Sequence, residues 1–159
     1  MDELLASRPK FKVSKTLLDV SKAGYKGRKN KKGFYKYDEK GKKVSGQVDA
    51  EIYSFYGGNS RTKMDANDIH MRCGFAMINE AALCLQEGII ESPLDGDIGA
   101  VFGLGFPPFR GGPFRYIDEL GAQKAVDILN DLTARFGERF EPAQILLDYA
   151  KNGKKFYTN

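Results

Sequence analysis

One long apolar stretch, residues 73–85, constrains this chain more than any other feature. Within it, only Gly74, Asn79 and Glu80 are not apolar. A helix that is apolar on nearly all sides must be surrounded by other elements. We therefore expect this stretch to form a helix at the centre of the core.

The residues on either side of the stretch define a longer helix. Asp65 or Asn67 can cap its N-terminus, and Gly88 can end it. Asp68 and Arg72 are spaced i,i+4, which predicts an ion pair on the first turns. Capping and stop signals predict further helices after it, at residues 93–102, 114–120, 122–136 and 142–151.

The segment 103–113 is rich in glycine and proline, and it cannot form regular structure. We expect Phe106, Phe109 and the following Phe114 to pack over the core or over a neighbouring domain. Arg110 is the one side chain of this loop with an obvious catalytic chemistry. The sequence therefore predicts an interdomain loop here.

The length of 159 residues allows one domain, or a small domain with an appendage. We expect an all-α helical bundle at residues 64–159, a linker with a short helix at 44–63, and a glycine-rich aromatic arm at 1–43. No apolar run reaches the roughly 20 residues that cross a bilayer. The expected location is the cytoplasm, or an organelle matrix.

Positive charge gathers in residues 26–43, which hold nine of the 25 Lys and Arg residues. Three interpretations are open for this basic arm: a solvated arm, a contact with coenzyme A phosphates or an anionic membrane, and nucleic-acid binding. Nucleic acid is the least favoured, because charge alone is no recognition module. The candidate anion contacts are Arg28, Lys29, Lys31 and Lys32.

Two polar pairs allow a functional and a structural interpretation. Asn79 and Glu80 could offer hydrogen bonds to a substrate or an interface, but we favour a buried network with a helix N-terminus or Arg115, because buried polar groups need partners. Asp95 and Asp97 could suggest a metal site, yet two carboxylates in the first turn of a helix more simply complement its dipole.

Two longer stretches resemble a known family. One is the run Gly-Arg-Lys-Asn-Lys-Lys-Gly-Phe-Tyr at 27–35, and the other extends from Ile78 to Tyr116. Together they resemble the C-terminal part of the multifunctional fatty-acid β-oxidation protein, the α-subunit of the bacterial fatty acid oxidation complex and of the mitochondrial trifunctional protein. The resemblance implies two related helical repeats. Residues 1–43 match the tail of the first repeat, and 64–159 match the second.

In that family an enoyl-CoA hydratase part precedes an NAD-dependent 3-hydroxyacyl-CoA dehydrogenase. The resemblance thus implies a parent enzyme that converts 3-hydroxyacyl-CoA to 3-ketoacyl-CoA with NAD. Its partners would be the upstream dinucleotide-binding domain, the first repeat, the acyl-CoA substrate and a thiolase β-subunit. We expect this chain alone to be inactive and to act as scaffold and interdomain interface. The alternative is a non-catalytic module that binds anionic partners through residues 26–43.

The family's chemical groups are missing from this sequence. The dehydrogenase uses a His–Glu dyad, and the single histidine, His70, lies outside such a motif. The glycines of 103–105 follow no predicted strand, so they do not form a dinucleotide-binding turn. Met71 stands where the resemblance places a substrate-positioning Asn, and methionine cannot make those hydrogen bonds. We predict no catalytic, cofactor-binding or metal-binding residue here.

Overall fold

The computed structural model describes residues 8–10, 14–60 and 62–158. The chain divides into two compact units, Met1–Lys63 and Met64–Asn159. We call them the N-terminal unit and the C-terminal unit. Among the helices of the described residues, none is long and apolar enough to cross a membrane.

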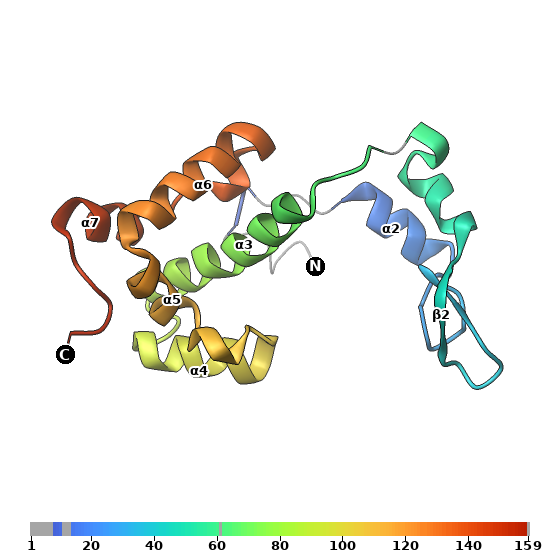
Figure 1. Cartoon of the computed structure of the whole chain (residues 1–159), viewed down its shortest axis with the longest axis horizontal. Coiled ribbons are helices and arrows are strands. Elements are labelled where there is room, and N and C mark those ends of the chain that lie inside the picture. The colour runs from blue at the N-terminus through green and yellow to red at the C-terminus, as the bar shows by residue number, and fades with distance from the viewer. Residues whose placement is uncertain (1–7, 11–13, 61, 159) are drawn as a thin grey trace. The chain divides into compact units, whose positions relative to one another are not determined.

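The N-terminal unit combines a short helix with a β-hairpin (Figure 1). Its elements are α2 (Lys15–Lys22), β1 (Tyr35–Tyr37), β2 (Lys43–Val48), and the 3-10 helices η1 (Ala50–Tyr56) and η2 (Gly58–Ser60). The two strands are antiparallel, with Tyr35 opposite Val48 and Tyr37 opposite Lys43. Residues 44–63, for which the sequence predicts a linker with a short helix, therefore contribute most of a strand as well as both 3-10 helices.

A small apolar cluster holds this unit together. Ile52 of η1 is fully buried, and Val20 of α2 is nearly so. The rings of Tyr25 and Phe55 meet edge to face, with centroids 5.6 Å apart. Aromatic pairs of this geometry add about 0.5–1.5 kcal/mol beyond the area that they bury. Of the aromatic residues of the predicted arm, Tyr25 thus packs against η1, while Phe34 and Tyr35 are exposed.

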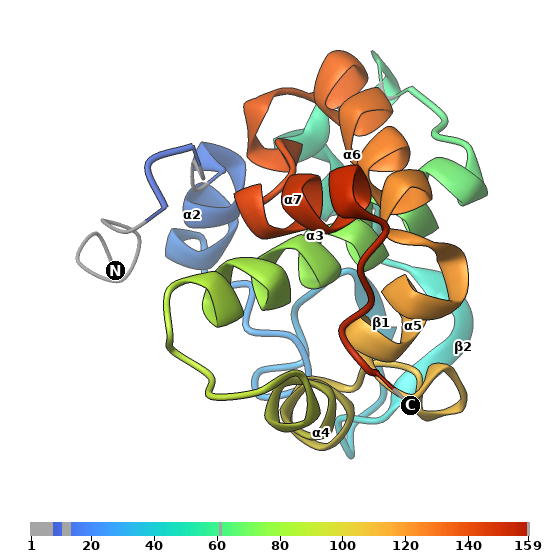
Figure 2. The same cartoon turned by 90° about the vertical axis from the view of Figure 1, so that its left-hand side faces the viewer.

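The C-terminal unit is a bundle of helices. It contains α3 (Ala66–Gln86), α4 (Pro93–Leu104), η3 (Pro108–Arg110), α5 (Pro113–Leu120), α6 (Ala122–Phe136), η4 (Glu138–Phe140) and α7 (Gln144–Asn152). Helix α3 runs through the middle, with α4 and α5 on one side and α6 and α7 on the other (Figures 1 and 2). This arrangement confirms the predicted all-α bundle.

Helix α3 supplies the centre of the core, as its apolar sequence predicts. Phe75, Ile78 and Ala82 are buried in one continuous cluster with residues of the other helices. Full burial of each large side chain contributes roughly 1.5–3 kcal/mol. The enclosure is not complete, because Cys73 and Glu80 lie on a side of α3 that faces solvent.

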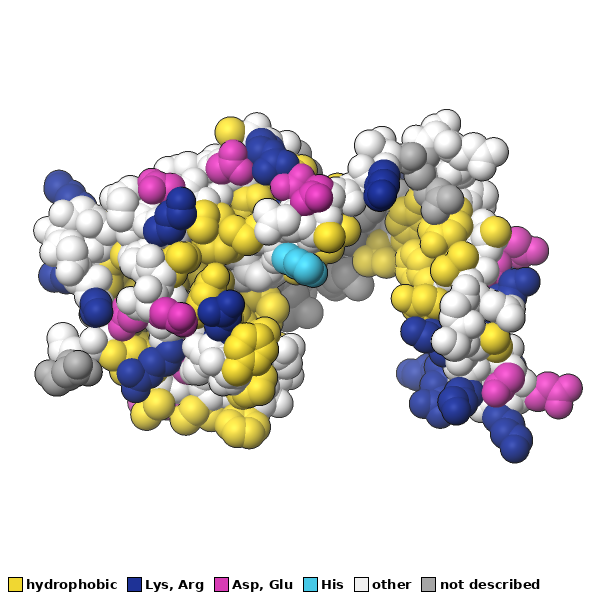
Figure 3. Space-filling model, in the orientation of Figure 1, with side chains coloured by type: hydrophobic (Ala, Val, Ile, Leu, Met, Phe, Trp, Pro, Cys, Tyr) yellow, Lys and Arg dark blue, Asp and Glu magenta, His cyan; other side chains and the backbone are white. Residues whose placement is uncertain are grey.

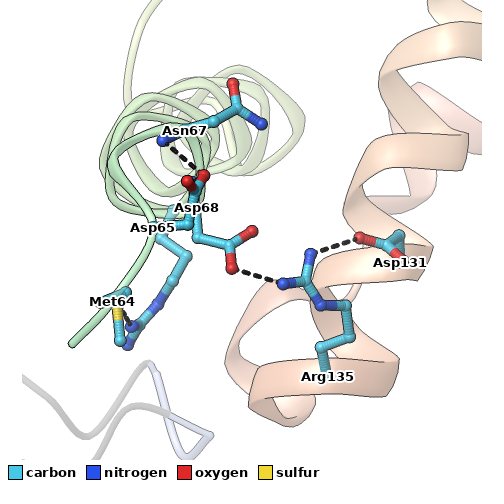
Figure 4. Close-up of polar contacts among 7 residues, drawn as sticks. Met64, Asp65, Asn67, Asp68, Asp131 and Arg135 are labelled. Carbon is cyan, nitrogen blue, oxygen red and sulfur yellow. Dashed lines mark hydrogen bonds and ion pairs between the residues drawn. The ribbon is translucent and has the colours of Figure 1, made fainter. Parts of the chain in front are cut away.

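The charged residues at the start of α3 form a tertiary contact in place of the predicted helical pair. Asp68 pairs with Arg135 of α6, which also bonds Asp131 at 3.2 Å (Figure 4). The Arg72 guanidinium instead lies 4.5 Å from the centre of the Phe136 ring. The predicted bond between Asp68 and Arg72 is therefore wrong, because a residue 67 positions away in sequence provides the better-placed cation.

Candidate functional site

The most deeply buried carboxylate of the C-terminal unit, Asp97 on α4, joins three segments of the chain. It is only 3% exposed. It accepts hydrogen bonds from the Phe114 N–H at 2.7 Å, the Arg115 N–H at 3.2 Å and the Tyr157 hydroxyl at 2.7 Å. Asp97 thus caps the N-terminus of α5 and ties α4 to the C-terminal segment.

The sequence predicts that Asp95 and Asp97 both complement the dipole of their own helix, α4. The structure places only Asp95 in the first turn of that helix. Asp95 accepts from the Ser92 hydroxyl at 2.6 Å, and its own N–H donates to that hydroxyl at 3.2 Å. The Ser92 hydroxyl thus caps the N-terminus of α4, and Asp95 holds that hydroxyl in place. Asp97 serves the next helix rather than its own, so the prediction that it complements the dipole of α4 is wrong.

The environment of Asp97 shifts two proton equilibria. Burial raises the pKa of the Asp97 carboxyl, while its hydrogen bonds from Tyr157, Phe114 and Arg115 act in the opposite direction. Burial and the neighbouring Asp97 raise the pKa of the Tyr157 hydroxyl. Tyr157 therefore stays protonated at neutral pH and remains a donor.

The C-terminal segment has further internal partners. The Phe156 and Tyr157 N–H groups each donate to the Asp118 carboxylate at 2.8 Å. The Arg115 guanidinium lies over the Tyr157 ring, 3.5 Å from its centre. Gly112, which precedes α5, has φ +117°, and a Cβ built on it would lie 2.4 Å from Asp97 atoms. The Gly112 backbone therefore lies directly against the Asp97 carboxylate.

Asn79 is the second buried polar side chain, and it positions α7. It is 5% exposed. Its Oδ1 accepts from the Ala143 N–H at 2.8 Å, and its Nδ2 donates to the Glu141 carbonyl at 2.8 Å. Ala143 is the residue that precedes α7. Asn79 thus meets a helix N-terminus and not Arg115, while its neighbour Glu80 is exposed.

Replacing Asn79 with alanine should lower the free energy of unfolding by about 2–3 kcal/mol, because the buried Ala143 N–H loses its acceptor. Urea unfolding followed by circular dichroism at 222 nm measures this loss. The matched control is His70→Ala, an exposed position on the same helix, for which we expect a change within about 0.5 kcal/mol. Equal losses in the two variants would show that Asn79 has no special anchoring role.

The aromatic residues of the predicted interdomain loop separate in the structure. Phe106 and Phe114 are buried in the core cluster. Phe109 is 82% exposed. Arg110 lies over the rings of Phe109 and Tyr116 and pairs with an acid of α5 at 3.7 Å. Of the three phenylalanines, Phe109 alone is available to a neighbouring domain.

An exposed apolar surface on α4 was not predicted from the sequence. It consists of Leu94, Ile98, Phe102 and Leu104, which we call the apolar ridge. Phe102 is 86% exposed and Leu104 74%. In Figure 3, hydrophobic side chains gather along the edge of the unit where Figure 1 places α4. The i, i+4, i+8 spacing of Leu94, Ile98 and Phe102 was the available signal, but Ala100 and Val101 between them hid the stripe.

The remaining predicted positions lie at the surface. His70 is exposed at the start of α3, and the candidate anion contacts Arg28, Lys29, Lys31 and Lys32 are exposed in the N-terminal unit. Among the described residues, no group of three His, Cys, Asp or Glu side chains is placed to hold a metal ion. The buried polar residues Asn79 and Asp97 are both bonded to backbone groups of neighbouring segments, whereas the buried Nε of Arg72 has no hydrogen-bond partner in the part of the chain that the structure describes.

Comparison with known proteins agrees with this helical architecture. The fatty acid oxidation complex subunit alpha of Shewanella amazonensis is 54% identical over 132 residues, which cover 83% of this chain and 19% of that protein. The same subunit of Vibrio vulnificus is 50% identical over 136 residues, 86% of this chain and 19% of that protein. The chain spans about a fifth of the length of these curated relatives. A family model described as 3-hydroxyacyl-CoA dehydrogenase, C-terminal domain, matches residues 69–158, and the chain belongs to that family.

Proposed function

We propose that this chain is a structural part of an NAD-dependent 3-hydroxyacyl-CoA dehydrogenase within a larger fatty-acid oxidation subunit. In this role it carries no catalytic residue and forms one wall of the parent enzyme. The proposal rests on the hydrogen bonds of the two buried polar residues of the C-terminal unit. Asp97 and Asn79 both fix helices by bonding backbone groups, and such groups are not available to a substrate.

The two units fit the two-repeat organisation of the family. The family model begins at residue 69, inside the C-terminal unit, and ends at residue 158. This supports the assignment of residues 64–159 to a complete second repeat. Residues 1–43 would then be the tail of the first repeat. The hairpin partner β2 extends that tail to residue 48, since the strand completes the fold of the N-terminal unit.

The interface role rests on the apolar ridge and Phe109. A contiguous apolar patch of several hundred Å² on a soluble domain marks an interaction surface. Gly99 and Gly103 lie beside Phe102 on the helix surface at 100° per residue. A Cβ on either would meet nothing within 4 Å. Because helix glycines cost stability and these two have no internal packing reason, they are suited to the close approach of another element.

The relatives supply the wider context of the proposal. Both are alpha subunits of a fatty acid oxidation complex. We infer that the parent protein binds NAD and acyl-CoA in its upstream domains, and that it assembles with a thiolase β-subunit. Its proposed compartment is the bacterial cytoplasm, or the mitochondrial matrix in a eukaryote.

NADH consumption with acetoacetyl-CoA tests the scaffold role directly. The purified chain alone should give no turnover at any concentration. A chimera, in which this chain replaces the matched segment of the Shewanella amazonensis subunit, should be active. Turnover by the chain alone, proportional to its concentration, would overturn the proposal.

Within that chimera, Phe109→Ser and Phe102→Glu should each lower dehydrogenase activity at least about tenfold, because docking of the C-terminal unit is loosened. In the isolated chain both variants should unfold at the same urea concentration as the parent, since the two rings are exposed. The matched control is Ile69→Glu, an exposed apolar residue of α3 away from the ridge. Destabilisation of the isolated chain equal to the loss of activity would contradict the interface role.

A further inference from the structure

Two basic segments that are separate in sequence meet in the N-terminal unit. The first is the loop 26–32, and the second is the hairpin turn 38–43 with its lysines. A Cβ on Gly41 would lie 3.4 Å from the Arg28 carbonyl oxygen and 3.8 Å from Arg28 Cγ, so the turn packs directly on the loop. In Figure 3, Lys and Arg side chains gather at this end of the hairpin. We call residues 26–43 the basic hairpin.

The charge of the basic hairpin is concentrated. Residues 26–43 hold nine Lys and Arg and two acids, a net charge of +7, while the whole chain carries +4. One of the acids, Asp38, is bonded to the N–H groups of Lys40 and Lys42, at 2.9 and 2.8 Å. Its oxygen therefore shapes the turn. Like charges held this close repel one another, and a bound anion relieves that repulsion.

The loop that carries these cations is held in one conformation by the side chain of Asn30. Its Oδ1 accepts from the N–H groups of Lys26 at 3.2 Å and Lys32 at 3.3 Å, and its Nδ2 donates to the Gly24 carbonyl at 2.6 Å. Lys31 adopts the left-handed region with φ 60°. The Gly27 N–H donates to the Lys32 carbonyl at 2.8 Å. This loop is thus a structured turn that presents its cations at the surface.

Tight packing of backbone and rings supports the loop from below. A Cβ on Gly33 would lie 2.9 Å from Gly27 Cα and 3.3 Å from the Tyr37 hydroxyl, so only glycine fits there. The Lys32 ammonium lies over the Tyr25 ring at 4.4 Å, and the Lys43 ammonium over the Tyr35 ring at 4.2 Å. These cation–π contacts direct two of the cations while leaving them exposed. The cluster is therefore preorganised, which lowers the cost of binding an anion.

We propose that the basic hairpin binds a small anion with two or more phosphate groups. The basic hairpin carries several cations on two joined segments. A ligand with several phosphate groups can contact more of these cations than a ligand with one phosphate group. Arg28 adds the planar fork that bonds phosphate oxygens in pairs. A small ligand is preferred to a nucleic acid, because basic charge alone does not amount to a recognition module. This binding is independent of the scaffold role proposed for the C-terminal unit.

Isothermal titration of the whole chain with inorganic pyrophosphate at low salt tests the proposal. We expect saturable binding of one equivalent, weakened by added salt. Titration with coenzyme A, which carries a pyrophosphate and a further phosphate, asks whether a nucleotide ligand binds at the same place. Sedimentation with vesicles of anionic lipid separates a membrane source of phosphate from a soluble one. Binding to vesicles without saturable binding of either soluble ligand would overturn the proposal.

Two charge-matched variants locate the site. Lys29→Glu with Lys31→Glu should weaken pyrophosphate binding at least tenfold. Lys154→Glu with Lys155→Glu changes the net charge equally in the C-terminal unit and should change binding less than twofold. Equal weakening by both pairs would mean that overall charge attracts the anion, and would refute a site on the basic hairpin.

A third variant, Asn30→Ala, keeps every charge and removes the three bonds that fix the loop. It should weaken binding about fivefold and speed amide exchange in residues 26–32, while the amides of η1 stay protected. Unchanged affinity in Asn30→Ala would contradict a preorganised site, because the cations alone would then suffice.

Discussion

Replacing Asp97 with alanine should lower the free energy of unfolding of the C-terminal unit by about 3–5 kcal/mol, because three donors lose a buried, charged acceptor at once. The Phe114 and Arg115 N–H groups begin α5 and have no partner within their own helix. The Tyr157 hydroxyl is held at the same carboxylate. Urea unfolding at neutral pH, followed at 222 nm, measures the loss.

Asp95→Ala is the matched control, two residues earlier on the same helix. It removes an exposed carboxylate that bonds the Ser92 cap, so we expect a loss of only about 0.5–1 kcal/mol. Asn at position 97 keeps one acceptor oxygen and should lie between the two variants. A loss at Asp97→Ala no larger than at Asp95→Ala would show that the three bonds contribute little.

The second large effect is expected for Gly112→Ala, with a loss of about 3 kcal/mol or more in the free energy of unfolding. Two costs combine here. A backbone at φ +117° is strained for any L side chain, at about 1–3 kcal/mol. The added Cβ would also lie 2.4 Å from Asp97 and push that carboxylate away from its donors.

Gly99→Ala on α4 is the control for the added methyl group itself. Gly99 lies in the helix with open space around it, so alanine should stabilise the fold by up to about 1 kcal/mol. Because Gly112→Ala disrupts the bonds of Asp97, its effect should be less than additive with Asp97→Ala. A loss at Gly112 close to zero would mean that the chain relaxes around Asp97 without breaking its bonds.

The sequence predicts the C-terminal unit well because the signals that begin and end helices are local. Asp65, one of the two caps that the sequence allows, bonds the N–H groups of Asn67 and Asp68 at the start of α3. The pair Ser92 and Pro93 begins α4, and a single glycine follows α6, as the sequence also predicts. Each of these signals acts within about four residues, so no knowledge of the tertiary structure is needed to recognise it.

The contacts that shape the candidate sites could not be predicted in the same way, since they join distant residues. Asp97 bonds Tyr157, which is 60 residues away, and the sequence near Asp97 shows only an acid in the first turn of a helix. Likewise, strand β2 has little alternation of apolar and polar residues, and it forms because the turn at Asp38 brings it back along β1. Phe102 is exposed because the core packs against another face of α4. Tertiary packing determines which face that is.

The long polar contacts also have a consequence for how the C-terminal unit is expected to fold. The bonds of Asn79 to Ala143 and of Asp97 to Tyr157 each close a loop of about 60 residues. Helices form from neighbouring residues within microseconds, whereas such loops close only after the chain has collapsed. We therefore expect these bonds to form late in folding. If they do, loss of either one should mainly speed unfolding and change the folding rate little, which stopped-flow folding and unfolding rates would measure.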